Sequence, residues 1–125
     1  MRDIKRYLLR MPLITSYLKK ILTNVTLLVT IMTVIKSFKH KGLQMFFETG
    51  SKKGIIPDHA EKLARILDRL DASISPGDMN LPAYRLHKMT GKEDGTWSVW
   101  VNGNWRITFR FEEKDAHLVD YRDYH

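Results

Sequence analysis

The sequence of 125 residues contains no cysteine. A disulfide framework, a zinc site built on thiolates and a cysteine nucleophile are therefore excluded. The sequence also lacks a glycine-rich phosphate-binding loop, the serine turn of the hydrolases and the fingerprint of dinucleotide-binding proteins. These absences exclude most common cofactor-dependent enzymes. We expect no cofactor, and a reducing, cytoplasmic environment.

An apolar run long enough to cross a membrane is also missing. Residues 21–35 carry no charge, but this run of about 15 residues is shorter than the roughly 18–20 that a spanning helix needs. It follows a basic segment, as in a secretory signal, yet no cleavage site of small residues comes after it. Three interpretations of residues 1–31 remain open: an upstream stretch translated by mistake before Met32, which we favour, a basic segment lying on a membrane surface, or a true signal or anchor.

Positive charge is concentrated in the first part of the chain. The formal net charge is +7, but residues 1–31 hold six basic side chains against one acidic, whereas residues 32–125 hold 15 basic and 13 acidic side chains. The length suits one domain, which we place at residues 32–125, with residues 1–31 as an extension outside it. Any RNA-binding site in the domain must therefore come from local clusters of Arg and Lys.

The pattern after Met32 predicts a strand and then two helices. Residues 34–38 form a β-branched run typical of a strand, and residues 41–49 have helical spacing that ends at Gly50. A second helix opens at Pro57, where the missing N–H is tolerated. Its apolar side chains form one stripe, which predicts packing on a flat surface: Ala60, Leu63, Ala64, Ile66, Leu67 and Leu70.

Four further strands are predicted, at residues 84–87, 97–101, 105–111 and 116–121, with a tight turn at Asn102-Gly103. Apolar and polar side chains alternate along residues 105–111. The helices should cover the aromatic side and leave Arg106 and Arg110 on the open side, where a guanidinium can hold a phosphate. A solvated strand face without function is the competing interpretation. Two helices packed on one face of an antiparallel sheet define an α+β domain.

The side chains suited to chemistry are histidines, carboxylates, a tyrosine and an arginine. RNA supplies its own nucleophile, the 2′-hydroxyl, so a protein needs only to transfer protons and to stabilise the charged phosphorane. Histidine with a carboxylate suits the proton transfers, arginine suits the phosphorane, and a tyrosine ring stacks on an unpaired base. His40 and His59 are expected to be structural, and His117 is unassigned. A metal site of His125, Asp123 and Asp120 is only weakly indicated, and we expect no metal.

Five stretches carry a resemblance to a known family, namely residues 35–43 (IKSFKHKGL), 84–87 (YRLH), 97–98 (WS), 104–109 (NWRITF) and 120–125 (DYRDYH). Over nearly all of residues 34–125 the chain resembles the HigB-type toxins of the RelE/ParE superfamily. The resemblance implies a microbial-ribonuclease-like RelE fold and a toxin of a type II toxin–antitoxin pair. Such a toxin is a ribosome-dependent endoribonuclease that cleaves mRNA in the A site of the 30S subunit, without a metal, and so inhibits translation. The implied partner is a helix-turn-helix antitoxin of the HigA type, and no membrane is implied.

The resemblance also assigns roles to individual residues. It implies proton transfer by His87 and His125, with Asp123 as base or orienting partner, Arg106 at the scissile phosphate and Tyr124 against the substrate base. RNA or ribosome contacts are also expected from four basic residues: Arg85, Lys88, Lys92 and Arg110. Relatives carry a lysine a few residues after the histidine that His87 matches, and here Lys88 or Lys92 replaces it. The family begins at its first strand, so residues 1–31 have no counterpart in it.

Three rival functions remain. The ParE branch of the superfamily has this fold, poisons DNA gyrase and lacks the catalytic set, which this sequence retains. A second rival is a module that only binds the antitoxin. In the third, residues 1–31 are a small membrane peptide fused to the domain.

Overall fold

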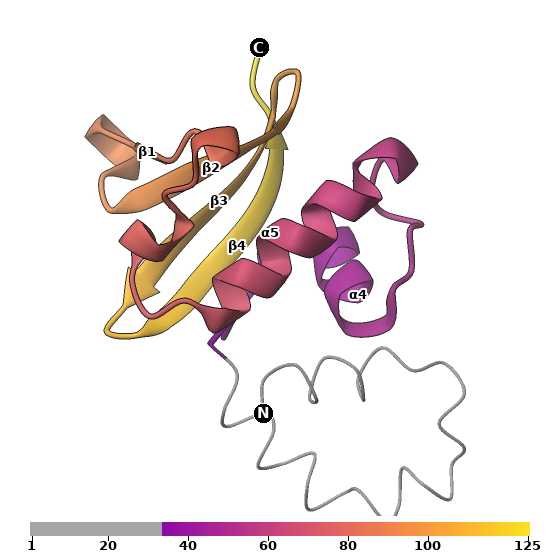
Figure 1. Cartoon of the computed structure of the whole chain (residues 1–125), viewed down its shortest axis with the longest axis horizontal. Coiled ribbons are helices and arrows are strands. Elements are labelled where there is room, and N and C mark those ends of the chain that lie inside the picture. Colours follow the sequence, from indigo (N-terminus) through magenta and orange to yellow (C-terminus); the bar gives the residue numbers. More distant parts are fainter. Residues whose placement is uncertain (1–33) are drawn as a thin grey trace, which may run out of the picture.

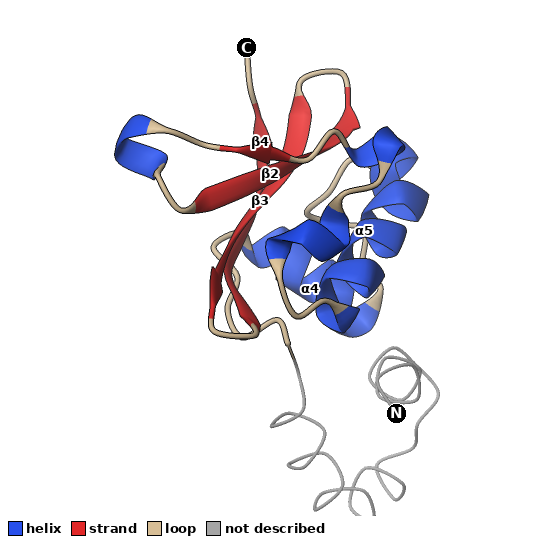
Figure 2. Cartoon of the chain, turned by 60° about the vertical axis from the view of Figure 1, so that its left-hand side comes forward, coloured by secondary structure: helices blue, strands red, loops and turns tan. Residues whose placement is uncertain are grey.

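A computed structural model of the chain describes residues 34–125, in which two α-helices lead into a four-stranded antiparallel sheet (Figure 1). Both helices lie on the same side of the sheet (Figure 2). The predicted α+β architecture is confirmed. The elements are α4 (Lys41–Thr49), α5 (Ala60–Ala72), β1 (His87–Lys88), β2 (Thr96–Asn102), β3 (Trp105–Glu112) and β4 (Asp115–Asp123).

The interpretations given to residues 1–31 lie outside the described residues. Within residues 34–125, no helix is both long enough and apolar enough to cross a membrane.

Helix α4 begins and ends where the sequence predicts. At its start, Nδ1 of His40 accepts a hydrogen bond of 2.9 Å from the N–H of Leu43, so this histidine has the structural role expected of it. At its end, Gly50 has a φ of 80° and donates its N–H to the carbonyl of Phe46. A left-handed residue at this position suits glycine because glycine lacks a Cβ. The helix buries Leu43, Phe46 and Phe47 in the core.

Helix α5 follows a 3₁₀ turn at Pro57–His59 and packs through the predicted stripe. Leu63, Ile66, Leu67 and Leu70 are fully buried, whereas Ala64 is half-buried at the margin of the stripe. They share one core with the helix-facing side chains of the sheet, including Val99, Val101, Ile107, Phe109 and Val119. The alternation predicted for residues 105–111 is therefore correct for the aromatic side.

The strands follow one another in the order β1-β2-β3-β4, and each neighbouring pair is antiparallel. The β2–β3 turn lies one residue later than predicted, because Asn102 pairs with Trp105 and leaves Gly103 and Asn104 as the loop. Of the two residues assigned to the turn, only Gly103 has a positive φ, 55°. Strand β4 extends beyond the predicted residue 121, since its ladder with β3 continues to Asp123.

The predicted strand at residues 84–87 is wrong over most of its length. A 3₁₀ turn occupies Pro82–Tyr84, and Arg85 follows with a φ of 48°, which is incompatible with an extended strand. Only His87 and Lys88 pair with β2.

The predicted strand at residues 34–38 is reduced to two isolated parallel bridges to β4, from Ile35 and from Phe38. A regular ladder is interrupted because β4 has a register shift where Leu118 adopts a φ of 54°. The start of the segment is bonded to Ala116 of β4 through the backbone, and it is also held by the buried side chain of Asp71 at the end of α5. One carboxylate oxygen of Asp71 accepts hydrogen bonds of 3.2 Å from the N–H groups of Val34 and Ile35.

Two glycines bring α4 against the loop that precedes α5. A Cβ built on Gly42 would lie 2.6 Å from the carbonyl oxygen of Gly54, and one built on Gly54 would lie 2.4 Å from the Cα of Gly42. Both distances are shorter than real Cβ atoms tolerate, so the two backbones touch directly.

Candidate functional site

The face of the sheet away from the helices carries a row of polar side chains. Paired residues of neighbouring strands point to the same face. The register therefore aligns His87, Ser98, Thr108 and Asp120 across the four strands. The row places His87, a predicted site residue, at the β1 edge of this face.

In a second row, two residues along the strands, Arg106 pairs with Trp100 on one side and with Arg122 on the other. The Trp100 ring lies at the β2 edge of the sheet, where Lys62 of helix α5 also reaches it. Tyr124 follows Arg122 by two residues and joins the same face, with the Arg122 guanidinium 5.0 Å from the centre of its ring. Arg106 is among the charges that act on the Tyr124 hydroxyl. The structure thus brings the predicted residues Arg106 and Tyr124 together, next to the row that begins at His87.

Residues 89–95, which we call the cover loop, connect β1 to β2 and contain a 3₁₀ turn at Gly91–Glu93. The loop is bonded to this face at two points. The Glu93 carboxylate lies 2.6 Å from Nη1 of Arg122 on β4, and the carbonyl of Asp94 accepts a 3.1 Å hydrogen bond from Arg110 on β3.

The cover loop contacts Arg110, which the sequence predicts to lie on an open face where it could hold a phosphate. Nη1 of Arg110 donates to the Asp94 carbonyl and to Oγ1 of Thr96 at 3.3 Å, and its RNA contact stays a prediction. Polar side chains that would otherwise be solvated are buried beside it, since Ser98 is 1% and Thr108 is 2% exposed. Within the part of the chain that the structure describes, the Oγ atom of Ser98 has no hydrogen-bond partner. The middle of this face is therefore a closed polar layer.

The Tyr124 hydroxyl is also buried, and it has no hydrogen-bond partner among residues 34–125. Burial raises the pKa of Tyr124, and the carboxylates of Glu93 and Asp120 raise it further, whereas Arg122 and Arg106 lower it. The neutral phenol is thus favoured, and it faces two arginines and two carboxylates. Such a hydroxyl can donate a hydrogen bond to a substrate atom that enters the site.

The C-terminal residues divide between the two faces of the sheet. Asp123 pairs with Trp105, whose ring contacts Tyr121 and His59 on the helix side. The carboxylate of Asp123 lies 3.0 Å from Nδ1 of His125. The structure therefore joins Asp123 to His125 and places this pair around the β4 edge from Tyr124.

His87 and His125 lie at opposite edges of the sheet. His87 is on β1 and His125 follows β4, so three strand spacings of about 4.8 Å each separate them across the sheet. Along the strands they are also offset, because His87 is level with Asp120 and His125 lies five residues further on. Arg106, on β3, lies between them. The side chain of His125 is 74% exposed, and His87 is also exposed, so both imidazoles can reach a ligand from solvent.

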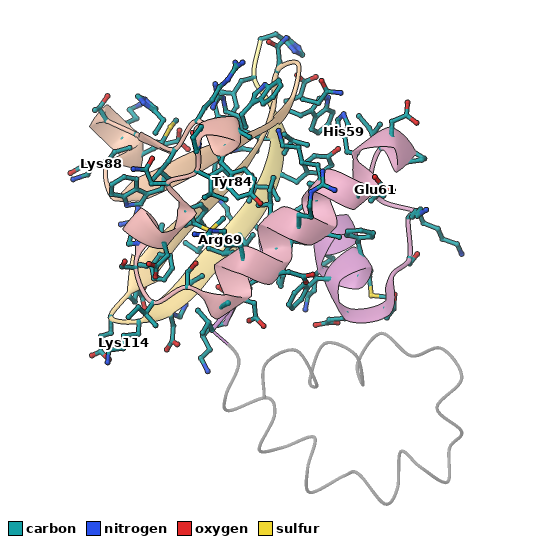
Figure 3. The ribbon with its side chains drawn as sticks, in the orientation of Figure 1. His59, Glu61, Arg69, Tyr84, Lys88 and Lys114 are labelled. Atoms are coloured by element: carbon teal, nitrogen blue, oxygen red, sulfur yellow. The ribbon has the colours of Figure 1, made fainter. Side chains whose placement is uncertain are left out.

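The two lysines that the sequence could not separate occupy different positions. Lys88 pairs with Trp97, on the face opposite to His87, and its Nζ lies 5.8 Å from the centre of the Trp97 ring. Figure 3 shows Lys88 at the β1 side of the molecule. Lys92 is exposed in the cover loop, next to Glu93. Of the two, Lys92 is the lysine attached to the polar face.

The structure contains a basic cluster around Trp100, of which only Arg85 was predicted from the sequence. Nζ of Lys62 lies 3.9 Å and Cζ of Arg85 lies 4.3 Å from the centre of the Trp100 ring. Burial lowers the pKa of Lys62, and the nearby charges of Arg65 and Arg85 lower it further. None of the ion pairs formed among residues 34–125 involves Lys62, Arg65 or Arg85. The spacing along α5 places Lys62 on a solvated helix face, and no pattern in the sequence indicates its contact with Trp100.

The remaining histidines have structural partners. His59 is buried, and its Nδ1 lies 2.6 Å from the hydroxyl of Tyr121, in agreement with the structural role expected of it. His117 lies 3.6 Å from the Glu112 carboxylate in β3. Within residues 34–125, no group of three or more His, Asp or Glu side chains is arranged to hold a metal ion.

Fold and site together describe a small α+β protein with a histidine, arginine and tyrosine face, and comparison with known proteins assigns its class. Residues 36–125 match the family of HigB-like toxins, described as RelE-like toxins of type II toxin–antitoxin systems. The chain belongs to this family. The RelE-type fold expected from the sequence agrees with the helices and sheet observed here.

Individual relatives agree with the family. The chain is 41% identical to the endoribonuclease HigB of Proteus vulgaris over 92 residues, which are 74% of this chain and 100% of the relative. It is 33% identical to the toxin HigB-1 of Vibrio cholerae serotype O1 over 90 residues, 70% of this chain and 94% of the relative. An uncharacterized protein of Haemophilus influenzae is 31% identical over 90 residues, 70% of this chain and 88% of the relative.

Proposed function

We propose that this toxin is an endoribonuclease that cleaves mRNA in the ribosomal A site and thereby inhibits translation. The observation that carries the proposal is the joint placement of Arg106 and Tyr124 on one sheet face, in the row next to that of His87, with the Asp123–His125 pair at the adjoining edge. The name of the Proteus vulgaris relative supports the reaction type.

The arrangement suits cleavage by the 2′-hydroxyl of the RNA itself. Arg106 lies between the strands that carry the two histidines, so a phosphate held by its guanidinium has a proton-transfer group on either side. Asp123 orients and stabilises the imidazole of His125 through their 3.0 Å contact. Tyr124 contacts the substrate base or donates its hydroxyl. Either histidine can act as the general base, with the other as the acid.

The RNA-contacting surface extends from this site toward the β1 edge. Arg85 precedes His87 by two residues and lies over Trp100, which shares its row with Arg106. Lys62 approaches the same ring from α5 and adds a cation without an ion-pair partner among residues 34–125. Cations that are not neutralised within the protein suit a polyanion. We assign RNA or ribosome contacts to these residues and to Lys92 in the cover loop.

A toxin of a type II system has a cognate antitoxin. We propose that this antitoxin is a helix-turn-helix protein of the HigA type.

The test uses the full chain, purified from its antitoxin complex and added to ribosomes programmed with a defined mRNA. Primer extension maps the cut ends, and a reaction with chelator runs beside it. Cleavage that requires ribosomes, is lost in His125→Ala and is indifferent to chelator supports the proposal. A folded protein that leaves the mRNA intact, while inhibiting gyrase or binding only its antitoxin, would contradict it.

A further inference from the structure

One ion pair fastens the cover loop across the sheet. Nη1 of Arg122 lies 2.6 Å from the Glu93 carboxylate, although Glu93 lies between β1 and β2 and Arg122 is on β4 at the other edge of the sheet. Nε of Arg122 also lies 3.7 Å from Asp120. The guanidinium is thus held between a carboxylate of its own strand and one from the loop.

A second contact seats the loop beside this pair. Arg110 donates to the Asp94 carbonyl, and its guanidinium fills the space next to Gly95, where a Cβ would lie 2.7 Å from Nη2. Gly91 and Gly95 lie within the loop, with φ values of 69° and 91° that glycine adopts readily. Two arginines of the sheet therefore hold the loop at adjacent positions: Arg122 pairs with Glu93, and Arg110 bonds to Asp94.

The same Arg122 side chain contacts the candidate site. Its guanidinium lies over the Tyr124 ring at 5.0 Å, and both Arg122 and Glu93 act on the Tyr124 hydroxyl. A cation over an aromatic face favours one placement of the ring. Any movement of Glu93 away from Arg122 therefore changes the surroundings of Tyr124 and the position of Lys92 together.

We propose that Glu93 and Arg122 are positioning residues for RNA cleavage. Their ion pair holds the cover loop, with Lys92, against the sheet and fixes the Tyr124 ring beside Arg106. Neither side chain contacts the reacting atoms. The inference rests on the proposed function in taking Tyr124 and Arg106 as residues of the cleavage site.

A purely structural ion pair and a positioning pair make different predictions. The Glu93 and Arg122 side chains are 39% and 28% exposed, and pairs with this much solvent contact contribute little to global stability. Breaking the pair should therefore leave the unfolding midpoint nearly unchanged, while the rate of cleavage falls.

The test is a charge-reversal cycle in the full chain. Glu93→Arg and Arg122→Glu, each alone, should lower kcat for ribosome-bound mRNA by roughly tenfold or more, with KM changed much less. The double variant, Glu93→Arg with Arg122→Glu, restores an ion pair of opposite polarity and should recover most of the lost kcat. Hydrogen exchange at the amides of residues 91–95 should rise in each single variant and fall again in the double variant.

Matched controls separate the pair from general charge effects. Glu112→Arg and Lys114→Glu make charge reversals at the β3–β4 turn, where Figure 3 labels Lys114, at the opposite end of β4 from Tyr124. Both should cleave at the unmodified rate. Single reversals at Glu93 or Arg122 that keep full kcat, a double variant no better than the singles, or unchanged exchange in the loop would each overturn the inference. Absence of cleavage by the unmodified protein would instead overturn the proposed function, and this inference with it.

Discussion

The buried carboxylate of Asp71 allows one perturbation to be worked out in detail. It is fully buried at the end of α5 and accepts hydrogen bonds from the N–H groups of Val34 and Ile35. Replacing Asp71 with Ala removes the acceptor and leaves both N–H groups in the interior. The segment that lies along β4 then loses its attachment to the helix layer.

The magnitude follows from the two bonds. A hydrogen bond to a charged group contributes about 1.5–3 kcal/mol, and the 3.2 Å distances of both bonds favour the lower part of that range. Losing both should lower the free energy of unfolding by about 3–5 kcal/mol. For a domain of this size, each kcal/mol corresponds to about 4–8 °C in Tm, so the midpoint should fall by at least about 12 °C.

Thermal and urea unfolding, followed by circular dichroism on the full chain, would measure this loss. Asp71→Asn is the matched variant, because it keeps an acceptor oxygen without the charge, and it should lose less than half as much. An Asp71→Ala protein that loses under 1 kcal/mol would refute the reasoning. It would mean that water or a backbone rearrangement satisfies the two N–H groups at no cost.

Four further predictions concern other residues. Phe109→Ala should destabilise by about 3–5 kcal/mol in urea unfolding, because the ring is fully buried, and a loss near zero would argue against that packing. Ser98→Ala should leave stability unchanged or raise it by about 1 kcal/mol, since it removes a buried hydroxyl that has no hydrogen-bond partner in the described residues. A clear loss of stability would reveal an unseen partner. Burial raises the pKa of the Tyr84 hydroxyl, so the neutral phenol contributes stability below pH 10. This contribution is lost as the pH rises through the pKa of the folded state. Tyr84→Phe should therefore show a smaller decrease in Tm at alkaline pH than the unmodified protein. Lys62→Ala should weaken ribosome binding and lower its salt dependence, as should Arg85→Ala, and an unchanged salt slope for either would remove that residue from the RNA surface.

The helices could be predicted closely because their signals are local. Gly50 ends α4 by backbone geometry alone, and the stripe of α5 depends only on spacing along the chain. The strand at residues 105–111 was equally clear, because side chains alternate there over one long element. Each of these features is set by residues within a few positions of one another.

The misassigned strands depend on contacts that spacing does not contain. Residues 34–38 resemble a strand, but their start is bonded to Asp71, which lies more than thirty positions along the chain. Residues 84–87 also have strand-like composition, yet Arg85 leaves the extended region beside Trp100. Long-range partners decide the backbone at both places.

The candidate site was predicted as a set of residues and not as an arrangement. Alternation along β3 and β4 places Arg106 and Tyr124 on one face, and the sequence could have shown that Asp123 and His125 lie on the other. It could not show that the cover loop folds back on the sheet. That requires the contacts of Glu93 with Arg122 and of Asp94 with Arg110, whose partners are well separated in the sequence.

The contact between Gly42 and Gly54 limits how this domain can diverge in sequence. A side chain added at one position would meet backbone at the other, and no smaller residue exists that could compensate. The two positions therefore accept change only if the loop before α5 moves away from α4. Insertions or deletions between them are tolerated only when the new loop returns a glycine to the same point. In homologous sequences, the loss of one glycine should accompany a change in loop length and not a substitution at the other glycine.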